Sequence, residues 1–260
     1  MDHQAIAAEL LRQHDKREQS RPLHGLLAKA DLENAYAVQQ RFVRLLRDRG
    51  GVAVAGYKVA LTSKRMQAMC GIDHPAAGVV LANRVHPSGV TLKAADFGRV
   101  GLEFEIGVRI GRDLPASSGP FTFEKLADSV AAVCPAFEVV DDRRANYAEL
   151  EIATLIADNA WNAGIVLGPW RTEWPDLAAV RGTVKLNGAE VDAGHGRDVL
   201  GHPFAPLVWL AERLAQTGAG LRAGDVVLTG SLVTTRFPAV TEAYDFAVEG
   251  LGSVSVTVEV

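Results

Sequence analysis

The stretch that most constrains the fold is the run from Val100 to Ile110, where two glutamates interrupt an otherwise apolar strand. Side chains two residues apart in a strand point to the same face, so Glu103 and Glu105 should converge on one point. Two adjacent like charges need a positive partner. Mg²⁺ accepts carboxylate oxygens and keeps positions open for water and substrate. A strand with one wet polar face fits the same pattern, so both interpretations stay open at this point.

A third glutamate and a lysine lie in stretches that are equally apolar. Glu138 stands in VCPAFEVV, with no other charge between Asp128 and Asp141, and Lys58 stands in VAVAGYKVAL. A buried carboxylate without a partner is costly, so Glu138 needs one or has a raised pKa. Lys58 could pair with Glu138 or another acid. It could equally act beside a metal–carboxylate cluster as an electrostatic clamp or proton donor.

Composition and charge exclude several classes of protein. The 260 residues suffice for one large domain, and a hydrophobic content of 48% argues against disorder. A net charge of −4 lacks the basic footprint of nucleic-acid binding. Two cysteines, Cys70 and Cys134, are too few for a disulfide framework and lack zinc-site spacing. No apolar run approaches the roughly 18 residues of a membrane span, and no secretory signal begins the sequence, so we predict a cytoplasmic protein.

The order of elements predicts a helical beginning and a β-rich remainder. Two runs with helical spacing fill residues 1–50, and Gly50-Gly51 ends the second. Expected strands are 52–61, 89–92, 100–110, 131–140, 165–167 and 226–229, an Asn-Gly hairpin within 184–191, and strands through 246–260. Expected helices are 62–70, capped by Thr62 or Ser63, 122–130, 150–157 and 206–214, with a connection at 75–80.

Short strands with scattered helices fit a largely β barrel or roll. A doubly wound sheet is disfavoured because regular βαβ alternation is missing. The sequence also lacks a dinucleotide-binding glycine loop, a Walker A loop and a nucleophile elbow. We therefore predict a helical N-terminal segment, residues 1–50, followed by one β-rich catalytic unit, residues 51–260.

Six short motifs occur along the chain: GYKVALTSKRMQ from Gly56, LEFEIGV from Leu102, PAFEVVD from Pro135, DNAWNAGIVLG from Asp158, AGDVVLTGSLV from Ala223 and GLGSVSV from Gly250. In this order they resemble the 2-keto-4-pentenoate hydratases and 4-oxalocrotonate decarboxylases of the fumarylacetoacetate hydrolase superfamily. Their order is specific for the family and much less so for the reaction. The resemblance implies an α+β fold built on a mixed β-roll, and a homo-oligomer.

The resemblance also implies roles for nine residues. The implied ligands of Mg²⁺ or Mn²⁺ are Glu103, Glu105 and Glu138. The implied catalytic residues are Lys58, against the metal, and Asp158. The implied substrate-binding residues are Thr62, Ser63, Asn159 and Ser231.

The chemistry of the implied substrate fits these residue types. A 2-oxo acid or its dienol offers two oxygens that chelate one cation, and the cation stabilises the enolate that develops at C2. We therefore expect a metal-dependent lyase that hydrates a 2-hydroxy-2,4-dienoate in aromatic meta-cleavage catabolism. Two alternatives stay open. One is decarboxylation of a 2-oxo-dioate such as 4-oxalocrotonate, and the other is a non-catalytic subunit in a complex of related hydratase and decarboxylase chains.

One position departs from the hydratase pattern. Hydratases of this family often carry an acid just after the proline of a D-x-P-D segment, where this chain reads Asp73-His74-Pro75-Ala76. A proton-handling group is therefore missing or comes from another residue. His74 is the nearest substitute, although a lone loop histidine is more often exposed than catalytic.

Overall fold

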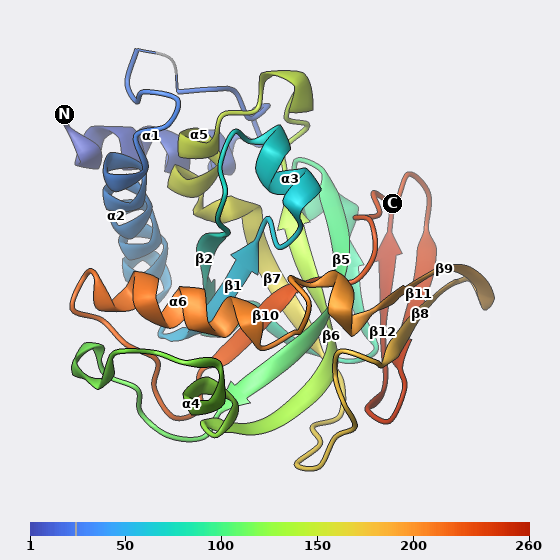
Figure 1. The fold of residues 1–260 in the computed structure, drawn as a ribbon. Coiled ribbons are helices and arrows are strands. Elements are labelled where there is room, and N and C mark those ends of the chain that lie inside the picture. Colours follow the sequence, from blue (N-terminus) through green and yellow to red (C-terminus); the bar gives the residue numbers. More distant parts are fainter. Residues whose placement is uncertain (24) are drawn as a thin grey trace.

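The computed structural model describes residues 1–23 and 25–260, and within them the strands form a seven-stranded and a five-stranded sheet (Figure 1). The strands of the larger sheet are β1 (Val54–Ala60), β2 (Ala76–Leu81), β3 (Val85–Pro87), β5 (Val100–Ile110), β6 (Val130–Asp141), β7 (Asn162–Leu167) and β10 (Val226–Ser231). Its hydrogen-bonded order is β2-β1-β10-β5-β6-β7-β3. The smaller sheet contains β4 (Val90–Lys93), β8 (Arg181–Leu186), β9 (Ala189–His195), β11 (Glu242–Val248) and β12 (Gly252–Glu259), in the order β4-β12-β11-β8-β9. Over the described residues neither order closes on itself, so the fold is a roll and not a barrel.

Helices flank the larger sheet. The α-helices are α1 (His3–Asp15), α2 (Leu32–Gly50), α3 (Lys64–Met69), α4 (Phe123–Ala127), α5 (Ile152–Ala157) and α6 (Ala205–Ala215). Short 3-10 turns occur at η1 (Ala82–Arg84), η2 (Ala94–Asp96), η3 (Ala116–Ser118), η4 (Tyr147–Glu149), η5 (Asn159–Trp161) and η6 (Gly196–Asp198). The carboxylate of Asp31 accepts the N–H of Asn34 at the start of α2, and Gly51 ends this helix with a φ of 61°. No helix in residues 1–23 and 25–260 is long and apolar enough to cross a membrane.

The antiparallel pair β5 and β6 lies at the centre of the larger sheet and has two different faces. Phe104 pairs with Phe137 across the two strands, and Glu103 pairs with Glu138 one position away. The ring centroid of Phe104 lies 5.3 Å from the ring centroid of Phe137 and 5.7 Å from that of Phe246 on β11. The aromatic face therefore packs on the smaller sheet, and the glutamates project from the opposite face.

Most of the predicted elements are present, and two predictions were wrong. Residues 75–80 were expected to be a connection, but 76–81 form β2, which pairs antiparallel with β1 and is largely buried. Pro75 and Gly78 resemble turn residues in the sequence, whereas burial of the apolar side chains around them favours a strand. The helix expected at 122–130 ends at Ala127 because Val130 already begins β6. The hairpin was predicted correctly, with φ of 49° at Asn187 and 86° at Gly188.

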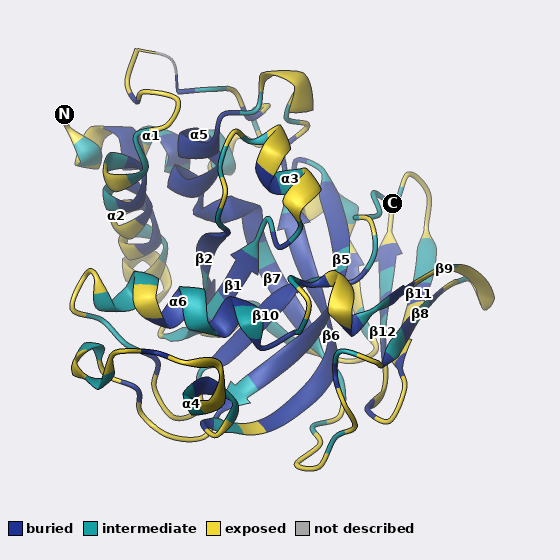
Figure 2. Cartoon of the chain, viewed as in Figure 1, coloured by how far each residue is buried: buried dark blue, intermediate teal, exposed yellow. Residues whose placement is uncertain are grey.

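One apolar core connects the helical segment to the sheets. Buried Ile6 of α1 and Phe42 of α2 belong to the same cluster as Phe104 and Val256. Buried positions are accordingly continuous from the helices into the larger sheet (Figure 2). The predicted α+β architecture with a helical N-terminal segment is confirmed. The division of the chain at residue 50 stays a prediction, although α2 does end at Gly50.

Candidate active site

Three glutamates and one lysine meet on the polar face of β5 and β6. One carboxylate oxygen each from Glu103, Glu105 and Glu138 lies within 4.8 Å of the others. Lys58 of β1 places its Nζ 3.1 Å from Oε1 of Glu138. Glu105, Glu138 and Lys58 are buried, while Glu103 is partly exposed. These four residues are called the carboxylate cluster below. The strand spacing predicted that Glu103 and Glu105 converge, and the family resemblance implied that Glu138 and Lys58 join them.

Each glutamate of the carboxylate cluster accepts a hydrogen bond from a residue outside the cluster. Thr235 Oγ1 donates to Oε1 of Glu103 at 2.8 Å, and Asn162 Nδ2 donates to Oε1 of Glu138 at 2.9 Å. The backbone N–H of Gly230 donates to Oε2 of Glu105 at 2.6 Å. Within the described residues, Oε1 of Glu105 and Oε2 of Glu138 are buried and have no hydrogen-bond partner. The donors therefore orient the carboxylates and leave oxygens free for another ligand.

The pKa shifts within the carboxylate cluster indicate that its glutamates need additional positive charge nearby. Burial raises the pKa of Glu105 well above its ordinary value, and the charges of Glu138 and Glu103 raise it further. Burial raises the pKa of Glu138 to about 7, although the charge of Lys58 opposes this. Burial alone would lower the pKa of Lys58, but the three carboxylates outweigh burial and raise it. With all three glutamates ionised and Lys58 protonated, the negative charges exceed the positive charge, and one divalent cation would balance the difference. Carboxylate oxygens are suitable ligands for such an ion.

Gly230 allows the end of β10 to reach the carboxylate cluster. Its φ is +116°, and a Cβ at this position would lie 2.0 Å from Oγ1 of Thr62. A larger residue would displace Thr62 and the N–H that anchors Glu105. Because residue 230 is a glycine, the end of β10 can lie against both Glu105 of the carboxylate cluster and Thr62 in the loop that follows β1.

A cavity of about 480 Å³ opens from the carboxylate cluster and is lined there by Lys58 and Glu103. Three predicted substrate-binding residues, Thr62, Ser63 and Ser231, also line it. Ser63 caps α3 by accepting the N–H of Met66 at 3.3 Å. Ser231 accepts the N–H of Phe104 at 2.9 Å and donates to the carbonyl of Val233 at 2.8 Å.

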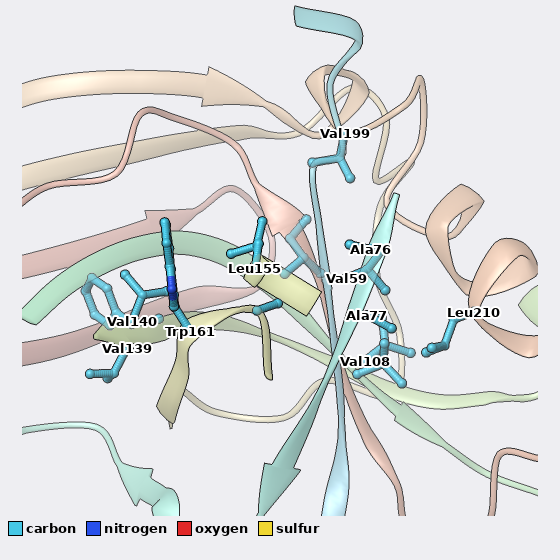
Figure 3. Close-up of a cluster of buried hydrophobic side chains, with 14 of the residues drawn as sticks. Val59, Ala76, Ala77, Val108, Val139, Val140, Leu155, Trp161, Val199 and Leu210 are labelled. Atoms are coloured by element: carbon cyan, nitrogen blue, oxygen red, sulfur yellow. The ribbon is translucent and has the colours of Figure 1, made fainter. Parts of the chain in front are cut away.

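The remaining cavity wall is mostly apolar. It includes Val140, Leu155 and Trp161, whose side chains gather in Figure 3. Leu150, Met66 and Phe237 extend it, each from a different loop or helix. Polar groups at one end and apolar groups at the other suit a short acid with an uncharged tail.

The described residues that line the cavity do not include Asp158 or Asn159. Asp158 is buried, accepting from Nε2 of His14 at Oδ1 and from Nη2 of Arg143 at Oδ2, both at 2.6 Å. His14, Arg143 and Asp158 are called the Asp158 cluster below. Asn159 clamps Val79 of β2: its Oδ1 accepts the N–H at 2.7 Å and its Nδ2 donates to the carbonyl at 2.9 Å.

These contacts hold a strained turn beside the cavity. Residues 159, 160 and 161 have φ of 52°, 47° and 59°, a left-handed conformation that costs non-glycine residues free energy. Trp161 at the end of this turn lines the cavity. Asp158 and Asn159 therefore support the cavity wall through the turn and do not touch the cavity themselves.

The position that departs from the hydratase pattern does not line the cavity either. Ala76 begins β2 and is buried near Ala77, Val59 and Leu210 (Figure 3). His74 donates from Nδ1 to the carbonyl of Pro75 at 2.7 Å, and its ring lies 6.0 Å from that of Trp209. Neither residue is among the described residues that line the cavity, so this structure does not support His74 as a substitute proton carrier.

Comparison with known proteins assigns the chain to a family. The sequence profile described as fumarylacetoacetate (FAA) hydrolase C-terminal matches residues 58–259. The chain belongs to this family. The six motifs had predicted this membership, which is thereby confirmed.

Curated relatives and solved structures of the fumarylacetoacetate hydrolase family extend over nearly all of the chain. A 2-keto-4-pentenoate hydratase of Burkholderia vietnamiensis is 34% identical and is aligned over 98% of each chain. A 2-hydroxyhexa-2,4-dienoate hydratase of Comamonas testosteroni is 34% identical over 86% of this chain and 85% of its own. The 4-oxalocrotonate decarboxylase of Pseudomonas putida G7, complexed with calcium and acetate, has a TM-score of 0.90 and 26% identity over 98% of this chain and 96% of its own. The same enzyme complexed with magnesium and adipate has a TM-score of 0.87 and 25% identity over 98% and 97%.

The sequence motifs of the fumarylacetoacetate hydrolase family contained some of the residues that sequence reasoning missed. Asn162 lies in the motif from Asp158, and Gly230 precedes Ser231 in the motif from Ala223. Thr235 lies outside all six motifs, in the loop after β10, and nothing in its sequence context indicates contact with Glu103. Tyr147 and Phe237, which also line the cavity, are likewise outside the motifs.

Proposed function

We propose that this protein is a divalent-metal-dependent hydratase that adds water to a 2-hydroxy-2,4-dienoate or its 2-oxo tautomer. The observation that carries the proposal is the carboxylate cluster, with its two unpartnered buried oxygens, at one end of a cavity that is otherwise mostly apolar. The full-length relatives named as hydratases of such acids support the reaction.

Glu103, Glu105 and Glu138 would hold the cation, and we propose Mg²⁺ or Mn²⁺ because all three ligands are hard carboxylate oxygens. When bound, the cation supplies Lewis acidity that stabilises the enolate of a 2-oxo acid. Thr235, Asn162 and Gly230 keep the ligand oxygens oriented through their hydrogen bonds. The anchoring of each carboxylate through one oxygen supports a preformed site.

Lys58 would act on the oxygen at C2 of the substrate. Its Nζ lies beside Glu138, lines the cavity and stays protonated because the carboxylates raise its pKa. The ammonium can donate a hydrogen bond to the C2 oxygen while the proton of the dienol hydroxyl is transferred to C5, which gives the ketone with a conjugated C3–C4 double bond. Water then adds across this bond, with its hydroxyl group going to C4 and its proton to C3. Thr62 and Ser63 offer hydroxyls to the carboxylate end of the substrate, and Ser231, whose hydroxyl donates to Val233, lines the cavity beside them.

Asp158 and Asn159 enter this proposal as supports of the cavity wall, through the turn that ends at Trp161. The sequence motif had suggested a catalytic role for Asp158. Both of its oxygens are occupied by His14 and Arg143, which favours a supporting role. A homo-oligomer, and a complex with a related decarboxylase or hydratase, also stay predictions.

Decarboxylation of a 2-oxo-dioate is the second candidate, and one residue favours it. Among the described residues that line the cavity, the positively charged side chains are those of Lys58 and Arg65. Arg65 belongs to α3 and is exposed. A distal carboxylate could pair with it. The apolar side chains on the cavity wall favour an uncharged tail instead, because an unpaired buried carboxylate is costly.

The test is a direct assay of both reactions on the purified protein with Mg²⁺. Hydration of 2-hydroxypenta-2,4-dienoate removes the conjugated chromophore and yields 4-hydroxy-2-oxopentanoate, which NMR identifies. Decarboxylation of 4-oxalocrotonate releases carbon dioxide. We expect turnover in the first assay and little in the second. Carbon dioxide release that Arg65→Met abolishes, without hydration, would reverse the order of the two candidates.

A further inference from the structure

Two aromatic side chains from separate loops stand at the cavity wall. Tyr147 lies in the segment between β6 and α5, and Phe237 lies in the segment between β10 and β11. The ring of Tyr147 packs edge-on against Trp161, with centroids 5.7 Å apart and planes at 70°. Phe237 lies over Gly101 of β5, where a Cβ would come within 2.7 Å of its ring. The absence of a side chain at Gly101 thus makes room for Phe237.

One ion pair connects the two aromatic side chains, Tyr147 and Phe237. Asp142 is buried and accepts hydrogen bonds at both oxygens from Arg99, the Nε to Oδ1 bond being 2.8 Å long. The hydroxyl of Tyr147 donates to Oδ2 of Asp142 at 3.1 Å. The Cζ of Arg99 lies 4.5 Å from the ring centroid of Phe237. The carboxylate of Asp142 therefore fixes the ring of Tyr147, and the guanidinium of Arg99 bound to it fixes the ring of Phe237.

We propose that Tyr147 and Phe237 are specificity-determining residues that contact the apolar tail of the substrate, and that Arg99 and Asp142 are the positioning pair that sets their separation. The inference rests on the proposed function, in which the carboxylate cluster and Lys58 bind the 2-oxo acid end. The tail then extends toward the remaining wall, which includes both rings. Because Asp142 binds the hydroxyl of Tyr147, the wall there presents aromatic carbon rather than a free polar group.

Binding of two unreactive 2-oxo acids separates this role from that of the carboxylate cluster. Pyruvate has the 2-oxo acid group and no tail, whereas 2-oxohexanoate has both. Titration calorimetry with the Mn²⁺-loaded protein measures each affinity. Arg99→Met should weaken 2-oxohexanoate about tenfold and Tyr147→Phe about threefold, while pyruvate and Mn²⁺ affinities stay unchanged. With the dienoate as substrate, KM should rise by similar factors and kcat should stay near the wild-type value.

A double variant and a matched control complete the test. If Arg99 and Tyr147 act through the shared Asp142, the double variant Arg99→Met/Tyr147→Phe should weaken the binding of 2-oxohexanoate by less than the product of the two single-variant factors. Arg49→Met removes a comparable bidentate pair, with Asp15, which joins α1 to α2 away from the cavity. It should leave both acid affinities unchanged.

Several results would overturn the inference. Equal weakening of pyruvate and 2-oxohexanoate by Arg99→Met would indicate a general disturbance of the site. Unchanged binding of 2-oxohexanoate in both variants would remove the roles of the two residues. If the wild-type protein bound Mn²⁺ but neither acid, the proposed function would fail together with this inference, whereas the first two results leave the proposed function intact.

Discussion

The carboxylate cluster and the Asp158 cluster are both buried, both contain acidic and basic side chains, and they differ in which atoms stay unpaired. In the Asp158 cluster both carboxylate oxygens accept hydrogen bonds, and the unpartnered atoms over the described residues are the donors Nε and Nη1 of Arg143. In the carboxylate cluster the unpartnered atoms are acceptors of Glu105 and Glu138. Free donors cannot bind a cation, and free acceptors can. The comparison indicates that burial of a charge does not by itself separate a supporting cluster from a reactive one.

The largest expected effect concerns the carboxylate cluster. Glu103→Gln, Glu105→Gln and Glu138→Gln keep the side-chain shape and remove one negative charge each, so the cation loses a charged ligand. We expect each variant to lose at least about 10⁴-fold in kcat/KM, about 5 kcal/mol, while the protein stays folded. Calorimetric titration with Mn²⁺ and circular dichroism measure the two properties. Unchanged Mn²⁺ affinity in two of the three variants would remove the ligand assignment.

For the Asp158 cluster the expected effect is on stability. Asp158→Asn leaves the buried charge of Arg143 without its counter-ion, which should cost about 3–5 kcal/mol of unfolding free energy in urea titrations. Turnover per folded molecule should stay near the wild-type value. Asp15→Asn is the matched control, because its pair with Arg49 is exposed and should contribute about 1 kcal/mol or less.

The opposite pattern at Asp158 would break the comparison. A large loss of turnover with little loss of stability would make Asp158 catalytic, as its sequence motif suggested. The two clusters would then differ in their pairing but not in their role.

Lys58 tests whether the carboxylate cluster has a catalytic cation or only a structural one. Lys58→Met keeps the apolar stem and removes the charge, so a catalytic lysine should lose turnover by about 10²-fold, about 3 kcal/mol. With Mn²⁺ bound, the melting temperature should change little because the cation already balances the carboxylates. A large fall in melting temperature with near-normal turnover would instead favour a structural ion pair with Glu138.

The sequence predicted the centre of the site because strand geometry is local. The spacing of Glu103 and Glu105 was sufficient to expect that these two side chains converge. The apolar context of Glu138 and Lys58 indicated that each needs a charged partner, and the family resemblance implied that the four residues meet. The sequence did not reveal which oxygens would be held and which left free. That depends on Thr235, which reaches Glu103 from 132 positions away in the sequence. Such contacts arise from the packing of distant segments, which no local pattern encodes.

The same limit explains the misplaced elements and the reassigned roles. β2 was mistaken for a connection because its strand character comes from burial against β1, which is set by tertiary packing. Asp158 lies in a family motif, but its partner His14 is 144 residues away. The helices α2 and α6 and the hairpin at Asn187 were predicted well, because the cap of α2, the apolar periodicity of both helices and the turn residues of the hairpin are all local.

The smallest expected effect sharpens the comparison without removing activity. A ligand that binds only the folded state stabilises it by RT ln(1 + [L]/Kd), about 2.7 kcal/mol at 100 times Kd. Mn²⁺ at that excess should raise the melting temperature of the metal-depleted wild type by about 5–10 °C. The shift should be the same in Asp158→Asn, since that cluster offers no free acceptor, and should vanish in Glu105→Gln. An equal shift in Glu105→Gln would place the bound cation elsewhere. A shift lost in Asp158→Asn would mean that the two clusters are coupled, through the turn at 159–161 or through Arg143.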